Sequence, residues 1–320
     1  MEFIITEVDG WKLKALIVSI IIAAAGYLGF SIWGGWQEVV DAFLKIGFLG
    51  TLIALLLSLV NYGLRFFRWQ VYLGQLGHKI HWLPSLRIYL SGFALTTTPG
   101  KAGEVFRGVL LKQRGVPYPK TLAAFVSERL SDLIAIVLLT LIGLSEYPEA
   151  TGIVIAGLIG IGIVLLSISS RTILDKTYLW VNLHTGKFYK LISHVLELLS
   201  AARGCHAPKL IIFSTTISLI AWGAEALAFY WVLQWLEADI SFSFAVFIYA
   251  LSMLVGGLSF LPGGLGSSEA VMISLLVLKG MTMPAAIAAT VFIRLATLWF
   301  AVVIGLVALY RSRHGERLAL

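Results

Sequence analysis

Charged residues are scarce in this chain of 320 residues. Asp, Glu, Lys and Arg make up 13% of it and hydrophobic residues 59%, whereas soluble domains carry about 25% charged residues. The single cysteine, Cys205, excludes an internal disulfide and a metal site built from several cysteines. The composition therefore excludes a soluble enzyme or a nucleic-acid-binding domain, and it predicts an all-α protein that crosses a membrane several times.

Motifs for ATP use and for common hydrolases are also missing. The chain has no G-x-x-x-x-G-K-[ST] loop, no H-E-x-x-H helix and no G-x-S-x-G turn. His78, His81, His184 and His194 lack the spacing of metal ligands. We therefore expect no metal, no cofactor and no enzymatic activity, so directional work would require an ion or lipid gradient.

Eight apolar stretches are long enough to cross or enter a membrane. Since about 20 apolar residues span the hydrocarbon core, six of them are predicted to be full transmembrane helices: 13–33, 46–64, 121–144, 150–168, 210–235 and 284–309. The other two, 86–111 and 242–278, are interrupted near the middle and are predicted to be helical hairpins. The first hairpin should re-enter the membrane, and the second either re-enters or spans it.

The distribution of basic residues predicts the orientation of the chain. With both termini in the cytoplasm, most Lys and Arg residues lie on the cytoplasmic side, as the positive-inside rule requires. Residues 171–207 combine basic and apolar side chains and are expected to form an amphipathic connection on that face. We therefore expect a single membrane domain, residues 1–320, in the cell (inner) membrane.

An internal repeat links the two halves of the chain. A shift of 165 positions superposes Glu104 on Glu269, Gly115 on Gly280 and Arg129 on Arg294, and it carries residues 46–64 onto 211–229. Repeat one covers about 46–144 and repeat two about 210–309, and the predicted topology gives them opposite orientations. Inverted repeats with broken helices near the midplane are typical of transporters.

The hairpin breaks predict a polar cavity. A break leaves backbone groups without partners, which lipid cannot supply, so breaks persist only inside protein or beside water. The helix that starts after each break offers amide donors and a positive dipole end to an anion. Capping of these helices by Glu104 and Glu269 is an alternative reading. The break residues are Pro99, Gly100, Gly103, Pro262, Gly263, Gly264 and Gly266.

Ionisable residues inside the apolar stretches mark a candidate substrate site. Each costs roughly 2.5–3.5 kcal/mol at the centre of a membrane helix, so these side chains need internal partners or water. Glu128 and Asp132 are four residues apart and share one helix face. The candidate substrate-binding residues are Glu104, Arg107, Glu128, Arg129, Asp132, Glu269 and Arg294. A closed structural network, Glu104 with Arg129 and Glu269 with Arg294, is the alternative.

Three further residues are secondary candidates for the site. Glu225 lies in the span 210–235, and Arg65 and Arg68 follow the span 46–64. We expect these two arginines to extend to lipid phosphates at the membrane surface, because long basic side chains do so near helix ends.

Several of these segments together resemble the lysylphosphatidylglycerol synthase transmembrane-region family. They are the stretch from Pro99 to Glu104 with Arg107, the Ser-Glu-Arg-Leu-Ser-Asp stretch at 127–132, and Pro262-Gly263-Gly264-Leu265-Gly266 with Glu269. The resemblance runs through essentially the whole chain. It implies a flippase-like protein similar to the flippase half of the multiple peptide resistance factor. Family members that make the lysyl-lipid carry a soluble synthase domain after the membrane part, and we expect none here.

The residues and the resemblance together predict a lipid flippase. Its substrate would be a phospholipid or another phosphate-containing lipid, with an aminoacylated or glycosylated head group as an option. An ion-coupled carrier of a small anion, a non-transporting membrane scaffold and an intramembrane enzyme using Glu128 and Asp132 remain alternatives. The expected partners are membrane lipids, with a second copy of the chain or a lipid-synthesising enzyme as options, and no nucleic acid.

Overall fold

The computed structural model describes residues 35–97, 102–169, 202–259 and 261–315, with scattered residues between 21 and 32 and between 176 and 200. Every regular element in this part of the chain is helical, which confirms the all-α prediction. The elements are α2 (Trp36–Gln75), α3 (Trp82–Ser91), η1 (Gly92–Leu95), α4 (Ala102–Lys112), α5 (Tyr118–Ile142), η3 (Leu144–Glu146), η4 (Pro148–Ala150), α6 (Thr151–Ser169), α9 (Pro208–Trp235), α10 (Phe242–Leu258), η5 (Pro262–Gly264), α11 (Ser267–Leu278), α12 (Met283–Arg294), the π-helix η6 (Leu295–Trp299) and α13 (Phe300–Gly315).

Five of the six predicted full spans coincide with described helices, and most of 13–33 lies outside the described residues. Three helices are long and apolar enough to cross a membrane by length and composition: Trp36–Gln75, Pro208–Trp235 and the continuous Met283–Arg311. The 25 residues of α5 would extend about 37 Å at 1.5 Å per residue, but three charged side chains interrupt its apolar character. The chain is a multi-pass membrane protein.

The outer surface of the helices is apolar. Along α2, the side chains of Leu44, Phe48, Leu49 and Leu56 are all more than half exposed. A soluble protein rarely exposes a continuous apolar surface of this kind. Lipid is therefore the solvent for this face.

Short helices flank both predicted hairpin breaks. α3 and η1 precede the first break and α4 follows it, while the break residues Pro99 and Gly100 lie outside the described residues. Gly263 and Gly264 form the second break with φ angles of 62° and 66°, a left-handed region that glycine adopts without a steric penalty. The 11 residues of α4 and 12 of α11 extend about 16–18 Å, roughly half of the hydrocarbon core.

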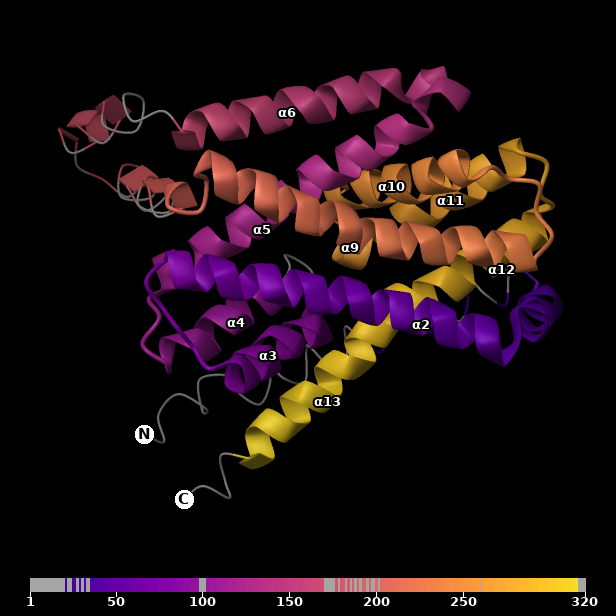
Figure 1. Ribbon diagram of the computed structural model, residues 1–320, viewed down its shortest axis with the longest axis horizontal. Helices are drawn as coiled ribbons and strands as arrows, with labels where there is room; N and C mark the ends of the chain where they lie inside the picture. Colours follow the sequence, from indigo (N-terminus) through magenta and orange to yellow (C-terminus); the bar gives the residue numbers. More distant parts are fainter. Residues whose placement is uncertain are drawn as a thin grey trace.

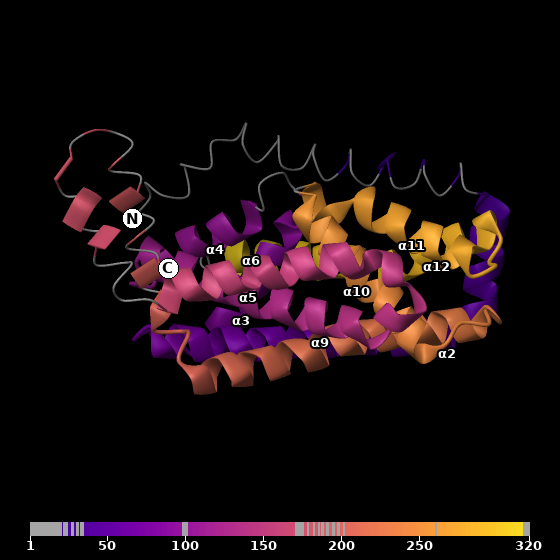
Figure 2. The same ribbon diagram turned by 90° about the horizontal axis from the view of Figure 1, so that it is seen from above.

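The helices α2 and α9 pack side by side and antiparallel along the length of the molecule (Figure 1). Lys45 near the start of α2 lies 3.2 Å from Glu237 beyond the end of α9, and midway Asn61 Nδ2 donates to the Ala221 carbonyl at 2.9 Å. Each hairpin directly follows one of these helices, so the two hairpins start from opposite ends of the molecule. Seen from above, α2 and α9 lie on one face, and α4 and α11 lie towards the other (Figure 2).

Two turns recur in the halves with matching backbone hydrogen bonds. Residues 76–78 after α2 donate to residues 72–74, and residues 236–238 after α9 donate to 232–234 in the same pattern, 160 positions later. The turns at Gly115 and Gly280, 165 positions apart, share two such bonds. The turns at Gly115 and Gly280 agree with a register of 165 positions, and the turns after α2 and α9 agree with one of 160 positions. The match of 46–64 with 211–229 stays a prediction.

Equivalent helices of the two halves also make equivalent contacts. The first hairpin packs through α3 on α13, and the second packs through α10 on α5. Likewise α9 packs on α5, and α2 packs on α12. These paired contacts, together with the antiparallel α2 and α9, are the arrangement that two inverted units would produce.

Candidate functional site

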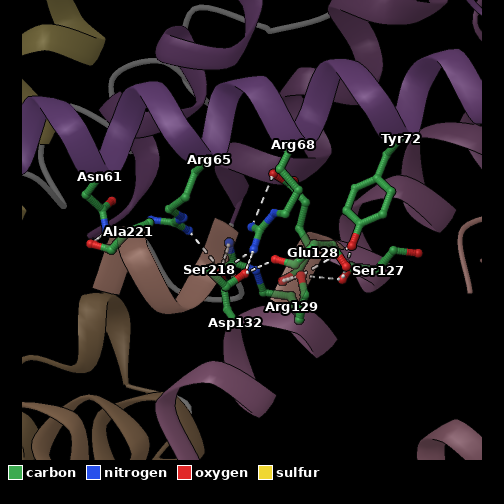
Figure 3. Close-up of polar contacts among 12 residues, drawn as sticks. Asn61, Arg65, Arg68, Tyr72, Ser127, Glu128, Arg129, Asp132, Ser218 and Ala221 are labelled. Carbon is green, nitrogen blue, oxygen red and sulfur yellow. Dashed lines mark hydrogen bonds and ion pairs between the residues drawn. The ribbon is translucent and has the colours of Figure 1, made fainter. Parts of the chain in front are cut away.

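Three arginines converge on Asp132 in the middle of the molecule (Figure 3). Arg65 Nη2 lies 3.1 Å from Asp132 Oδ2, Arg68 Nη1 lies 2.6 Å from Oδ1, and Arg129 Nη2 lies 3.2 Å from Oδ2. Glu128, one turn earlier on the same face of α5, lies 3.9 Å from Arg68 Nη2. The predicted common face of Glu128 and Asp132 is confirmed, and both side chains are buried.

The prediction that Arg65 and Arg68 extend to lipid phosphates is wrong. Arg68 is fully buried, and the side chain of Arg65 is 12% exposed. The physical reason is that α2 continues to Gln75, so both residues lie inside the helix rather than at its end. There the carboxylates of α5 compensate their charges, and Arg68 also donates a hydrogen bond to Ser218 of α9.

Arg107 joins the first hairpin to this cluster. Its Nη1 lies 3.3 Å from Glu128 Oε2. Its guanidinium stacks over the rings of Trp69 at 4.7 Å and Tyr89 at 5.1 Å, an arrangement in which the aromatic ring face attracts the cation. Two helices and a carboxylate therefore hold this predicted site residue in place.

Glu269 and Arg294 form the corresponding pair in the second half. Arg294 Nε donates to Glu269 Oε1 at 2.6 Å, and Arg294 Nη2 donates to the Gly263 carbonyl at the break, at 2.7 Å. Glu269 Oε2 also accepts from the Gly266 amide at 2.7 Å, so it caps α11. The capping and ion-pair alternatives for Glu269 are both observed. Arg294 binds both the second break and α11, the helix that follows it.

The counterpart site in the first half is described only in part. The backbone of Gly103 and Glu104 is helical, but the side chain of Glu104 lies outside the described part of the structure. Its predicted pairing with Arg129 therefore stays a prediction. The partner that Arg129 has here is Asp132, one turn away on its own helix.

Glu225 of α9 occupies a different environment. Its Oε2 accepts a hydrogen bond from the Tyr249 hydroxyl at 2.7 Å. The residue is 5% exposed and lines the central cavity. No Lys or Arg nitrogen of the described residues lies within 4.0 Å of this carboxylate.

A cavity of about 450 Å³ lies between the two hairpins and links these groups. Arg65, Arg107, Arg129 and Arg294 line it, together with Asp132 and Glu225. Apolar side chains and the glycines of the second break form much of the remaining wall. A cavity with charged groups in its wall therefore lies beside the second break, and arginine is its most frequent charged residue.

The positive charge of the site exceeds its negative charge among the described residues. The guanidinium groups of Arg65, Arg68, Arg107, Arg129 and Arg294 face the carboxylates of Glu128, Asp132, Glu225 and Glu269. Five cations thus meet four acids even when every acid is ionised. No group of three or more His, Cys, Asp and Glu residues in the described part of the chain is placed to hold a metal ion.

Sequence reasoning missed the aromatic and hydroxyl groups of the site. Tyr62 donates to the Thr297 carbonyl, and Tyr249 donates to Glu225. Tyr89 and Tyr249 are 160 positions apart, the spacing of the recurring turn. That register was the available signal for these tyrosines.

Comparison with known proteins places this architecture in a family. The family model described as the lysylphosphatidylglycerol synthase TM region matches residues 16–305. A UPF0104 membrane protein of Pyrococcus horikoshii is 22% identical, over 88% of this chain and 92% of its own length. A UPF0104 membrane protein of Methanothermobacter thermautotrophicus is 25% identical, over 89% of this chain and 92% of its own length. One of Methanocaldococcus jannaschii is 27% identical, over 68% of this chain and 93% of its own length. The chain therefore belongs to the lysylphosphatidylglycerol synthase transmembrane-region family.

Proposed function

We propose that this protein moves a phosphate-containing lipid between the leaflets of the cell (inner) membrane, without covalent chemistry, through the central cavity. The observation that carries the proposal is an arginine-lined cavity between two broken hairpins inside a bundle of membrane helices. Buried charges in such a bundle are costly and typically mark the path of a substrate.

The polar end of the cavity suits a phosphate group. Arg129 lines the cavity with a side chain 33% exposed, and its Nε has no hydrogen-bond partner among the described residues. The Nε of Arg65 is likewise without a partner in that part of the chain. A guanidinium fork matches the geometry of phosphate oxygens, and the excess of cations over acids among the described side chains favours an anion.

The size of the cavity favours a lipid whose acyl chains stay in the membrane. About 450 Å³ is within the range of pockets that hold small molecules, about 300–1,000 Å³, and thus suits a head group. Leu258 and Leu261 line the cavity next to the second break and are about half exposed. These apolar side chains provide the edge along which acyl chains would pass.

The arrangement of the two halves supports alternating exposure of the cavity. We infer two inverted units, about 46–144 and 210–309, with both termini in the cytoplasm and a cavity between them. The antiparallel α2 and α9 and the recurring turns support this inference. Two equivalent units allow an inward-facing and an outward-facing state of similar energy.

Reconstitution into liposomes tests the proposal. Fluorescent phosphatidylglycerol is the anionic probe, fluorescent glucosylceramide is the probe without phosphate, and a membrane-impermeant quencher reports leaflet accessibility. We expect translocation of the first probe only. Because a hydrogen bond to a charged group contributes about 1.5–3 kcal/mol, the Arg129→Gln variant should translocate about 10- to 100-fold more slowly.

Arg114→Gln is the matched control, because Arg114 is exposed and lies in the turn after α4, away from the cavity lining. It should translocate like the unmodified protein. Equal rates for the unmodified protein, Arg129→Gln and empty liposomes would refute lipid translocation. Equal rates for both probes would refute recognition of the phosphate.

A further inference from the structure

Glu225 differs from the other described acids of the site in its partners. Asp132 contacts three arginines, Glu128 contacts Arg68 and Arg107, and Glu269 contacts Arg294. Glu225 instead accepts one hydrogen bond from an uncharged hydroxyl, that of Tyr249. Among the described acids of the site, it is the one that no guanidinium neutralises within 4.0 Å.

An ionised carboxylate in this position is unfavourable. Glu225 is 5% exposed and is the eighteenth residue of the 28-residue membrane helix α9. A buried carboxylate without a paired cation takes up a proton rather than remain charged. The residue lines the cavity, so a proton can reach it from cavity water.

We propose that Glu225 is a proton-binding site and that proton binding there is coupled to binding of the lipid phosphate in the same cavity. The inference rests on the proposed function and adds its source of energy. A single exchangeable proton on a carboxylate that faces the transport cavity is the arrangement found in proton relays of membrane transporters.

The groups around Glu225 explain how the two binding events are linked. The charged and titratable groups that face it from the four packed helices are Tyr62 and Arg65 of α2, Asp132 of α5, Tyr249 of α10 and Arg294 of α12. When Glu225 is ionised, it attracts the two arginines and competes with a phosphate for them. When Glu225 is protonated, that attraction disappears, and the positive charge of both arginines attracts the lipid phosphate more strongly.

Proton and phosphate therefore favour each other's binding, because a coupling free energy between two sites is reciprocal. The proton comes from water on the acidic side and returns to water on the alkaline side, bound to Glu225 while the lipid phosphate occupies the cavity. The anionic lipid and the proton should move in the same direction. Their combined charge is smaller than that of the phosphate alone, which lowers the cost of crossing the midplane.

A pH gradient across proteoliposomes tests the coupling. With one proton per lipid, a difference of one pH unit should shift the steady-state leaflet ratio of fluorescent phosphatidylglycerol about tenfold. The Glu225→Gln variant should still equilibrate the lipid between leaflets but show no shift. The matched control is Glu149→Gln, at an exposed acid in the loop before α6, and it should shift like the unmodified protein.

Each outcome of this experiment separates the two proposals. Lipid that equilibrates in the unmodified protein without responding to the gradient overturns proton coupling and leaves translocation intact. A gradient response that persists in Glu225→Gln overturns the assignment to Glu225. Absence of any translocation overturns the proposed function and, with it, the coupling.

Infrared difference spectroscopy tests the proton site without any transport measurement. The unmodified protein at neutral pH should show the carbonyl stretch of a protonated carboxyl group, and Glu225→Gln should lack it. The Tyr249 hydroxyl donates to Glu225 Oε2 and thereby stabilises the ionised carboxylate. Because Tyr249→Phe removes this donor, the band of the protonated carboxyl group should persist to higher pH. Absence of the band in the unmodified protein, or its retention in Glu225→Gln, overturns the inference.

Discussion

Replacement of Asp132 by Asn is the sharpest test of the buried charge cluster. The carboxylate lies 2.6–3.2 Å from three arginines, and Asn keeps its shape while removing its charge. Arg68 is fully buried and cannot turn to water, and its remaining carboxylate, Glu128, is 3.9 Å away. The substitution therefore leaves a buried cation without a close counterion.

Breaking a buried ion pair from one side costs about 3–5 kcal/mol. At 1.4 kcal/mol per factor of ten, the equilibrium between folded and unfolded protein should shift by about two to three and a half orders of magnitude. Equilibrium unfolding in mixed detergent and SDS micelles, followed by tryptophan fluorescence, measures this change. Glu237→Gln is the control, because its pair with Lys45 is exposed and such pairs contribute about 0–1 kcal/mol.

A double-mutant cycle separates the charge interaction from general damage. Arg68→Met removes the cation that loses its partner in Asp132→Asn, so the double variant should be more stable than the sum of the single effects predicts, by about 0.5–3 kcal/mol. If Asp132→Asn destabilises the protein no more than Glu237→Gln, or if the two single effects simply add, the reasoning about this cluster is wrong.

Three further predictions follow from other parts of the structure. A Cβ on Gly305 of α13 would lie 2.9 Å from Ala94 Cα in the first hairpin, so Gly305→Ala should destabilise the protein by about 1–3 kcal/mol. The same unfolding assay measures this change, and no loss of stability would contradict the close backbone packing. A hydrogen bond from Ser243 lowers the pKa of Glu146 below its usual value of 4.5, so the stabilisation of the fold by the ionised carboxylate is present at neutral pH and lost as the pH falls below that value. Glu146→Gln should remove that part of the acid sensitivity when unfolding is measured against pH, and an unchanged profile would contradict the prediction. Burial raises the pKa of Cys205 to about 11, so at neutral pH a maleimide should label this thiol in SDS but not in the folded protein. Rapid labelling of the folded protein would contradict the burial of this thiol.

The spans and hairpins were predictable because they depend on local properties of the chain. Length and apolarity locate a membrane helix, and Pro262 with its two following glycines locates a break. Glu128 and Asp132 were recognisable as a pair because spacing within one helix decides which face they share. Glu269 was recognisable as a cap for the same reason, since it lies three residues after Gly266.

The partners of Arg68 and Glu225 were not predictable in this way. Arg68 meets Asp132 and Ser218, 64 and 150 positions away, and its place near the end of a predicted span suggested the membrane surface instead. Glu225 meets Tyr249 only because α9 and α10 pack together. The register of 160 positions was recognised from backbone geometry, since it appears in the hydrogen bonds of the turns after α2 and α9.

The amino-acid sequence alone determines that this chain lies in a membrane, where its apolar stretches are interrupted, and which charged residues fall within those stretches, because these properties depend on neighbouring residues and on the cost of transfer from water. The tertiary structure decides which charges neutralise one another and which acid remains without a cation. That difference arises from the crossing of α2, α5 and α9, where contacts between residues distant in the chain set the electrostatic environment of each side chain.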